Sequence, residues 1–243
     1  IRLSRYSDNA TDEVMEALKD FEGKNVKGVI LDLRSNPGGL LREAVGVASL
    51  FLPEGSLVVY TMGQDSSDRR EFKAYSRYTY DEKPLVVMVN KGSASASEIT
   101  AGAIQDHDRG VIFGQRTFGK GLVQSIIPLP DGNALKLTTA KYYIPSGRCI
   151  QKDDYLKEPS SAIISRYTED SEETAWEPES EKEEEEEEEE KIPFETMAGR
   201  TVYGGGGIKP DVVFEAPQLI KLSLKLVRQT LFFAFAVHYS AYH

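Results

Sequence analysis

Hydrophobic positions follow two different periods along the first 115 residues. Apolar residues at helical spacing predict three helices, at 14–21, 40–52 and 95–106. Runs rich in β-branched residues predict strands, at 26–33, 56–62, 84–90 and 111–114, and the alternation at 1–6 suits a further short strand. Strands that alternate with helices predict an α/β fold with a largely parallel sheet.

The pattern changes after residue 115. Two apolar runs, 123–129 and 134–144, flank Pro-Asp-Gly-Asn at 130–133, which predicts an antiparallel hairpin. Near the end, 212–214 predicts a short strand and 219–239 an amphipathic helix. No apolar run approaches the roughly 18–20 residues of a membrane-spanning helix. Because residue 1 is Ile and not Met, we expect the chain to be a piece of a longer protein.

The net charge of −10 comes from one segment. Residues 168–190 hold 14 Glu and one Asp against one Lys, so this segment carries −14 and the rest of the chain +4. We interpret 152–191 as an acidic, disordered insertion between core segments 1–151 and 192–243. A site for a metal ion or a basic partner is the alternative. The remaining chain shows no Lys/Arg stripe, which argues against nucleic-acid binding.

Cysteine and histidine counts narrow the chemistry. The single Cys149 cannot form a disulfide within the chain, and three scattered His residues make a metal site unexpected, so we expect no metal and no cofactor. Residues 114–121 nearly match a phosphate-binding loop. However, Gly121 replaces the hydroxyl residue that would bind magnesium, and a strand rather than a helix is predicted to follow, which argues against a nucleotide site.

Residues 91–98 are a candidate nucleophile site. A buried strand runs into a turn of small residues where a helix begins, and this geometry presents a serine hydroxyl beside free backbone N–H groups. The alternative is helix capping by Ser93 or Ser95, with Glu98 closing a capping box on Ser95.

A serine nucleophile needs a base. His107 lies on the same predicted helix, about 18 Å from Ser95, and His238 and His243 have no acidic residue near them in the sequence. A lysine can serve if burial keeps its amine neutral. Lys120, in a glycine-rich loop between apolar segments, is the candidate, and a solvated surface lysine is the alternative.

Four segments of the chain resemble carboxy-terminal processing proteases, also called tail-specific proteases, of the S41 serine peptidase family. They occur in the family's order: DLRSNPGG at 32–39, GSASASEI at 92–99, GQRTFGKGLVQ at 114–124 and GRTVYGGGGIKPDV at 199–212. The resemblance implies a layered α/β fold like those of ClpP and the crotonases. It also implies that Ser95 is the nucleophile, Lys120 the general base, and Gln124 the residue that orients this lysine.

The resemblance further implies an oxyanion hole built from backbone N–H groups. One belongs to Ala96 and the other to Gly38 or Gly39, between which the sequence does not choose. Family members usually carry a PDZ domain that recognises the C-terminus of the substrate, and nothing in this chain resembles one. We therefore expect a catalytic core without its PDZ domain.

The implied function is endopeptidase cleavage of unfolded or flexible C-terminal tails through an acyl-enzyme, in the periplasm or elsewhere outside the cytoplasm. The resemblance leaves a homo-oligomer and an adaptor protein open as partners. Two alternatives use the same scaffold. One is a non-catalytic relative that binds peptide or lipid, and the other is a crotonase-like acyl-CoA enzyme, which needs no Ser–Lys pair.

Overall fold

The computed structural model describes residues 1–24, 26–75, 78–80, 83–152, 192–214, 226 and 229–242. The chain divides into two compact units, Ile1–Val213 and Phe214–His243, which are described separately. Apart from its first residue, Lys152, the predicted acidic insertion at 152–191 lies outside the described residues.

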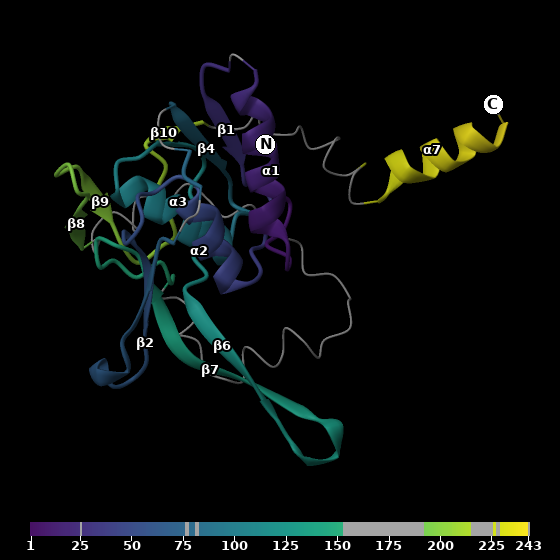
Figure 1. Cartoon of the computed structure of the whole chain (residues 1–243). Coiled ribbons are helices and arrows are strands. Elements are labelled where there is room, and N and C mark those ends of the chain that lie inside the picture. Colours follow the sequence, from purple (N-terminus) through teal and green to yellow (C-terminus); the bar gives the residue numbers. More distant parts are fainter. Residues whose placement is uncertain are drawn as a thin grey trace. The chain divides into compact units, whose positions relative to one another are not determined.

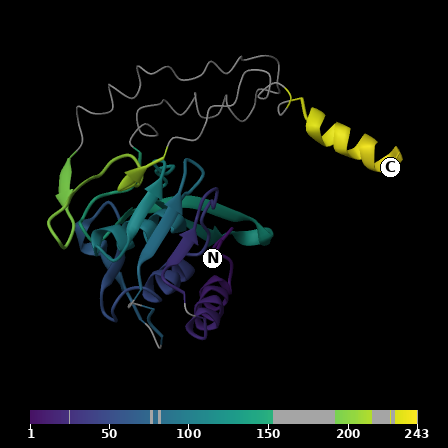
Figure 2. The same ribbon diagram turned by 90° about the horizontal axis from the view of Figure 1, so that it is seen from above.

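A four-stranded parallel sheet forms the centre of the first unit (Figures 1 and 2). Its order is β1-β4-β5-β10, with β1 at Val29–Asp32, β4 at Leu85–Val89, β5 at Val111–Gly114 and β10 at Val212–Val213. The predicted α/β fold with a parallel sheet is therefore confirmed. Strand β4 is less covered than its uniformly apolar sequence suggests, because alternate residues are only half-buried. Residues 1–6 form isolated bridges rather than a regular strand.

A second, antiparallel sheet has the order β3-β2-β7-β6. It contains β2 at Leu57–Met62, β3 at Arg70–Lys73, β6 at Leu122–Pro128 and β7 at Ala134–Tyr143. The predicted hairpin is present as β6 and β7, with the 3-10 turn η2 (Pro130–Gly132) between them. Strand β6 pairs only with β7, so its outer edge is unpaired within the described sheet. Short additions are the 3-10 turn η1 (Ser66–Asp68) and the pair β8 (Pro193–Glu195) and β9 (Thr201–Tyr203).

The described part of this unit contains three α-helices: α1 (Ala10–Glu22), α2 (Leu41–Ser49) and α3 (Ala96–Asp106). Helix α3 contacts α2, strand β5 of the parallel sheet and strand β2 of the antiparallel sheet, and all of its residues are buried. Small residues permit this close packing. A Cβ at Gly102 would lie 2.7 Å from the side chain of Ile144 and 3.0 Å from that of Ile208. Helix α3 is thus packed on several sides by the core.

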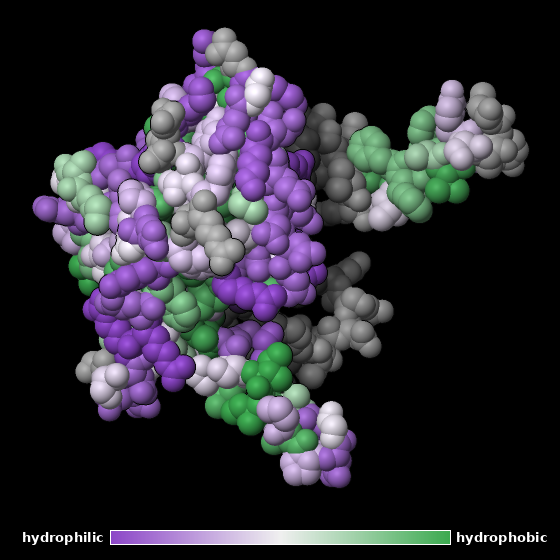
Figure 3. Space-filling model, in the orientation of Figure 1, coloured by the Kyte–Doolittle hydropathy of each residue, from purple (hydrophilic) through white to green (hydrophobic). Residues whose placement is uncertain are grey.

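Apolar side chains are exposed on the outer part of the β6–β7 hairpin (Figure 3). The hairpin's exposed large apolar residues are Ile126, Ile127, Leu129, Leu135 and Leu137. The second unit contains α7 (Leu231–Tyr242), which is apolar around its whole circumference and carries no charged residue apart from a histidine. The prediction of an amphipathic helix is therefore wrong for this part, because the lysines and the arginine precede it. No helix in the described ranges is both long and apolar enough to cross a membrane.

Candidate active site

Ser95 stands at a sharp turn between strand β4 and helix α3. Its backbone has φ 55° and ψ −112°, while the helix begins at the next residue, Ala96. A non-glycine residue in this region is strained by about 1–3 kcal/mol, and such strain persists only where the surroundings enforce it. This is the strand–turn–helix geometry of a nucleophile elbow. Ser95 is also half-buried rather than enclosed, so a substrate can reach it.

The neighbouring serines hold the turn in place. Ser93 Oγ donates to the carbonyl of Leu33 at 2.8 Å, and Ser97 Oγ donates to the carbonyl of Asn36 at 3.0 Å. Both serines are fully buried. Their hydroxyls therefore fasten the Ser95 turn to the segment at 33–36, and Ser95 is the one of the three that solvent reaches.

Gly38 lies directly against this turn, and Gly39 lies against Tyr6. A Cβ at Gly38 would be 2.8 Å from the amide nitrogen of Ala96, so the two predicted parts of the oxyanion hole are adjacent. The N–H of Gly38 already donates to Asn36 Oδ1 at 2.9 Å. Tyr6 holds the other side of the glycine turn, since its N–H donates to the Gly38 carbonyl. The N–H of Gly39 donates to no acceptor in the described part of the chain, so the geometry favours Gly39 over Gly38 as the second donor.

A buried carboxylate, Glu98, joins the Ser95 turn to the loop that carries Lys120. Glu98 Oε2 accepts the N–H of Ser95 at 2.8 Å and the N–H of Lys120 at 2.9 Å. Glu98 Oε1 accepts the hydroxyl of Thr117 at 2.6 Å and the N–H of Gly119 at 2.7 Å. Burial raises the pKa of Glu98, and the donated hydrogen bonds oppose that rise. The sequence indicated only the local capping bond to Ser95, not the link to the lysine loop.

The Lys120 and Ser95 backbones are therefore close together. Because both amide nitrogens contact the same carboxylate oxygen, they lie less than about 6 Å apart. The side chains are not joined in this way. Lys120 is exposed, and no hydrogen bond links its amine to Ser95 within the described residues. Gln124 is exposed on β6, directly after a bulge that shifts the register with β7.

The loop at 114–121 leads from β5 into strand β6, not into a helix. The prediction that it is not a phosphate-binding loop is consistent with this geometry, because no helix N-terminus follows it. In the described part of the chain, no three His, Cys, Asp or Glu side chains are grouped closely enough to hold a metal ion.

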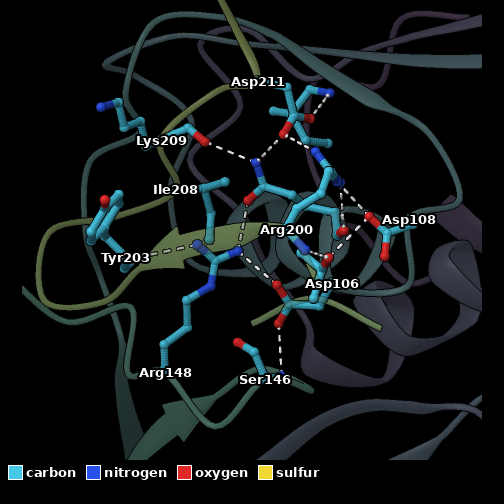
Figure 4. Close-up of polar contacts among 12 residues, drawn as sticks. Asp106, Asp108, Ser146, Arg148, Arg200, Tyr203, Ile208, Lys209 and Asp211 are labelled. Atoms are coloured by element: carbon cyan, nitrogen blue, oxygen red, sulfur yellow. Dashed lines mark hydrogen bonds and ion pairs between the residues drawn. The ribbon is translucent and has the colours of Figure 1, made fainter. Parts of the chain in front are cut away.

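The sequence analysis missed a polar cluster at the C-terminal end of α3 (Figure 4). Arg148 and Asp106, each 1% exposed, form an ion pair at 2.8 Å. Burial lowers the pKa of Arg148, and Asp106 opposes this effect. Arg200 pairs with both Asp108 and Asp211. No local pattern reveals this cluster, because its two arginines lie on opposite sides of 153–191 in the sequence.

The model of peptidase family S41 matches residues 1–157. The chain is 48% identical over 155 residues to the carboxy-terminal-processing protease of Bartonella bacilliformis, and this match covers 62% of this chain and 36% of that protein. It is 46% identical over 164 residues to the carboxyl-terminal-processing protease of Synechocystis, a match that covers 65% of this chain and 38% of that protein.

A solved structure, the photosystem II D1 C-terminal processing protease, is similar with a TM-score of 0.61 and 30% sequence identity. The match covers 88% of this chain and 41% of that structure. The chain thus spans between a third and a half of the length of these relatives.

Proposed function

Since the chain belongs to peptidase family S41, we propose that it is a serine endopeptidase that cleaves proteins in or near their C-terminal tails. The observation that carries this proposal is the strained, accessible backbone of Ser95 at the N-terminus of α3. Strain at a solvent-reachable serine between a buried strand and a buried helix has no role in packing and is typical of a nucleophile.

The proposed reaction uses Lys120 as the base. The neutral amine of Lys120 takes the proton of Ser95 Oγ while Oγ attacks the carbonyl carbon of the scissile peptide bond. The tetrahedral intermediate then collapses, the C–N bond breaks, and the lysine ammonium returns its proton to the departing amine. A water molecule, activated by the same amine, hydrolyses the acyl-enzyme and regenerates the Ser95 hydroxyl.

Backbone N–H groups stabilise the negative charge that develops on the carbonyl oxygen. We assign this role to Ala96 and Gly39, because Asn36 occupies the N–H of Gly38. The Ala96 amide is fixed before the reaction by the burial of α3. Gly39 is held by the bonds of its two neighbours, from the Tyr6 N–H to the Gly38 carbonyl and from the Leu40 N–H to the Tyr6 carbonyl, so little reorganisation is needed when the charge forms. Such preorganised donors contribute about 3–4 kcal/mol each to transition-state stabilisation.

An extended substrate fits the unpaired edge of β6. Lys120 precedes this strand and Gln124 lies on it, so a peptide that adds to the edge passes directly beside both residues. A bound peptide would also cover the exposed Lys120 amine, and desolvation favours the neutral form that a base requires. We infer that the substrates are unfolded or flexible tails, because a folded segment cannot add as a strand.

We further propose that the protein acts outside the cytoplasm, for example in the periplasm. Its similarity to processing peptidases that are named as chloroplastic supports a location in a compartment separate from the cytosol. Capture of the substrate's C-terminus by a PDZ domain, self-association and binding of an adaptor protein are further proposals.

The decisive experiment is labelling with a fluorophosphonate probe, which reacts with activated serines. The wild-type chain should be labelled and should cleave an unfolded protein, and Ser95→Ala should abolish both. Ser49→Ala is the matched control, because Ser49 is a buried helical serine in α2, away from the Ser95 turn. Labelling that survives in Ser95→Ala but disappears in Ser93→Ala or Ser97→Ala would contradict the choice of nucleophile. A wild-type chain that is never labelled would favour a non-catalytic relative or an acyl-CoA enzyme.

A further inference from the structure

Thr117 connects two parts of the molecule that are far apart in the sequence. Its side chain is 5% exposed, and its hydroxyl lies 2.7 Å from the N–H of Ile208 and 2.6 Å from Glu98 Oε1. The backbone N–H of Thr117 also donates to the carbonyl of Ile208 at 3.1 Å. One residue therefore contacts both the segment after 191 and the carboxylate that holds the Ser95 and Lys120 amides.

The chemistry of these partners fixes the direction of the hydrogen bonds. A carboxylate can only accept, so the Thr117 hydroxyl must donate its proton to Glu98. Its lone pairs are then free to accept the N–H of Ile208. The result is a directed chain of bonds from Ile208 N–H to the Thr117 hydroxyl to the Glu98 carboxylate. A hydroxyl can make both bonds at once, whereas an alkyl side chain of the same shape can make neither.

Residues 208–211, which we call the strap, run alongside α3. At one end, Ile208 meets Thr117 near the N-terminus of the helix, and the Ile208 side chain approaches Gly102 in the middle. At the other end, Gln105 Nε2 donates to the Lys209 carbonyl and to Asp211 Oδ1, both at 2.9 Å. Figure 4 shows this second attachment.

The strap contacts α3 near both of its ends. Gln105 lies seven residues after Glu98, a rise of about 10.5 Å along the helix. Arg200 fixes the far end further, because it pairs with Asp211 and donates to the Gln105 carbonyl. The strap is thus anchored at the C-terminal end of α3, and near the N-terminal end the Thr117 hydroxyl joins it to Glu98.

We propose that Thr117 is a positioning residue, whose hydroxyl transmits the position of the strap to Glu98 and thereby aligns the backbones of Ser95 and Lys120. This rests on the proposed serine-peptidase function. It adds that the segment after the acidic stretch contributes to catalysis through Thr117 and Glu98. The carboxylate holds the Ser95 and Lys120 amides through one oxygen, so a shift of Glu98 moves both residues together.

The test compares three variants of the full chain. Thr117→Val keeps the shape and removes both hydroxyl bonds, and Thr117→Ser keeps the hydroxyl. Ser49→Ala is the matched control, because Ser49 is a buried hydroxyl residue on α2 that bonds to Val45 and Tyr75 and not to Glu98. The measurements are kcat and KM on an unfolded protein, the rate of fluorophosphonate labelling and the melting temperature.

We expect Thr117→Val to lower kcat and the labelling rate by about 10- to 100-fold with KM nearly unchanged, as misplacement of reacting groups does. Thr117→Ser should stay close to the wild-type rates. Ser49→Ala should have a lower melting temperature and keep kcat. A Thr117→Val variant with the wild-type kcat would overturn the proposal, and so would an equal loss of kcat in Ser49→Ala, which would make the effect merely structural.

Amide hydrogen exchange separates this proposal from the proposed function. If the wild-type chain is inactive, the peptidase assignment fails, and exchange decides the positioning role alone. Thr117→Val should speed exchange of the amides at 118–121, and Thr117→Ser should not. Unchanged exchange at 118–121 in Thr117→Val would overturn the role of the hydroxyl.

Discussion

Replacing Glu98 with Gln tests whether one buried carboxylate holds the active site together. The change preserves the size of the side chain and converts one carboxylate oxygen into an NH2 group. Two donors contact each oxygen: Thr117 and Gly119 on Oε1, and Ser95 and Lys120 on Oε2. Whichever way the amide turns, two donors face a group that cannot accept.

The cost follows from counting these bonds. The Thr117 hydroxyl can rotate to accept from the new NH2, but its own proton then loses the bond to residue 98, at about 1 kcal/mol. The N–H of Gly119 is left without an acceptor in this less costly orientation, at about 1–3 kcal/mol. The bonds from Ser95 and Lys120 remain but lose the assistance of the charge, about 1 kcal/mol each. Removal of a buried charge offsets part of this loss. The net destabilisation is about 3 kcal/mol, which lowers the melting temperature of a core of this size by roughly 6–12 °C.

Thermal unfolding and the fluorophosphonate labelling rate measure the two consequences. Glu43→Gln is the control, because Glu43 is also buried, yet both of its bonds from Thr11 fall on a single oxygen that the amide can retain. Its other oxygen accepts from Arg42 Nε at 3.3 Å, and this exposed arginine can turn away from the new NH2 because it also pairs with Asp8. We expect Glu43→Gln to be nearly neutral and Glu98→Gln to lose both stability and labelling. Equal melting temperatures for the two variants would refute the reasoning, as would a destabilised Glu98→Gln that is labelled at the wild-type rate.

Four further predictions follow from the site and its surroundings. Lys120→Arg should be nearly as inactive in peptide cleavage as Lys120→Ala, because arginine keeps its proton at any working pH; an active arginine variant would remove the lysine from the mechanism. Gly39→Ala should fail to be labelled and should be less stable, because its Cβ would lie 2.1 Å from a backbone oxygen. The bonds that Asp108 accepts, chiefly from the Ala198 N–H and Arg200, outweigh burial and lower its pKa, so its contribution to stability is present at neutral pH and lost as the pH falls below about 4. Asp108→Asn should therefore lower the melting temperature at pH 7, and this loss should shrink as the pH falls below about 4. Deleting 168–190, which is highly charged and carries almost nothing to bury, should leave melting temperature and labelling unchanged.

Local signals predicted the elements that carry the candidate site. A uniformly apolar strand, a run of small residues and a glutamate three residues after Ser95 mark the strand–turn–helix, and Pro-Asp-Gly-Asn marks the hairpin. Each of these features depends on neighbouring residues, so pattern and structure agree. The prediction of an amphipathic helix at 219–239 is wrong for its described part, α7. The lysines and the arginine on which that prediction depends all precede Leu231, and α7 itself is apolar on every side.

Hydrogen bonds between residues far apart in the sequence could not be predicted from the hydrophobic pattern. Thr117 and Ile208 are 91 residues apart, and no periodicity links them. The same limit applies to the choice between Gly38 and Gly39, which depends on whether Asn36 occupies an N–H group. Backbone amides carry no identity in the sequence, so only the structure distinguishes a free donor from one in use.

The backbone of Lys120 is held in place by its hydrogen bonds, whereas its side chain is exposed to solvent. Sequence reasoning expected a buried amine, and the structure places this side chain in solvent. Its backbone, by contrast, is held by Glu98, and the neighbouring Phe118 N–H donates to the Ser93 carbonyl. In the proposed mechanism, the backbone frame of Ser95 and Lys120 is therefore set before substrate binds, while the environment that would make the amine a base is not. We infer that a peptide added to the β6 edge would complete that environment and so couple the activation of the base to the presence of an extended substrate. In this mechanism a folded protein, which does not supply the strand that covers the lysine, would not be cleaved.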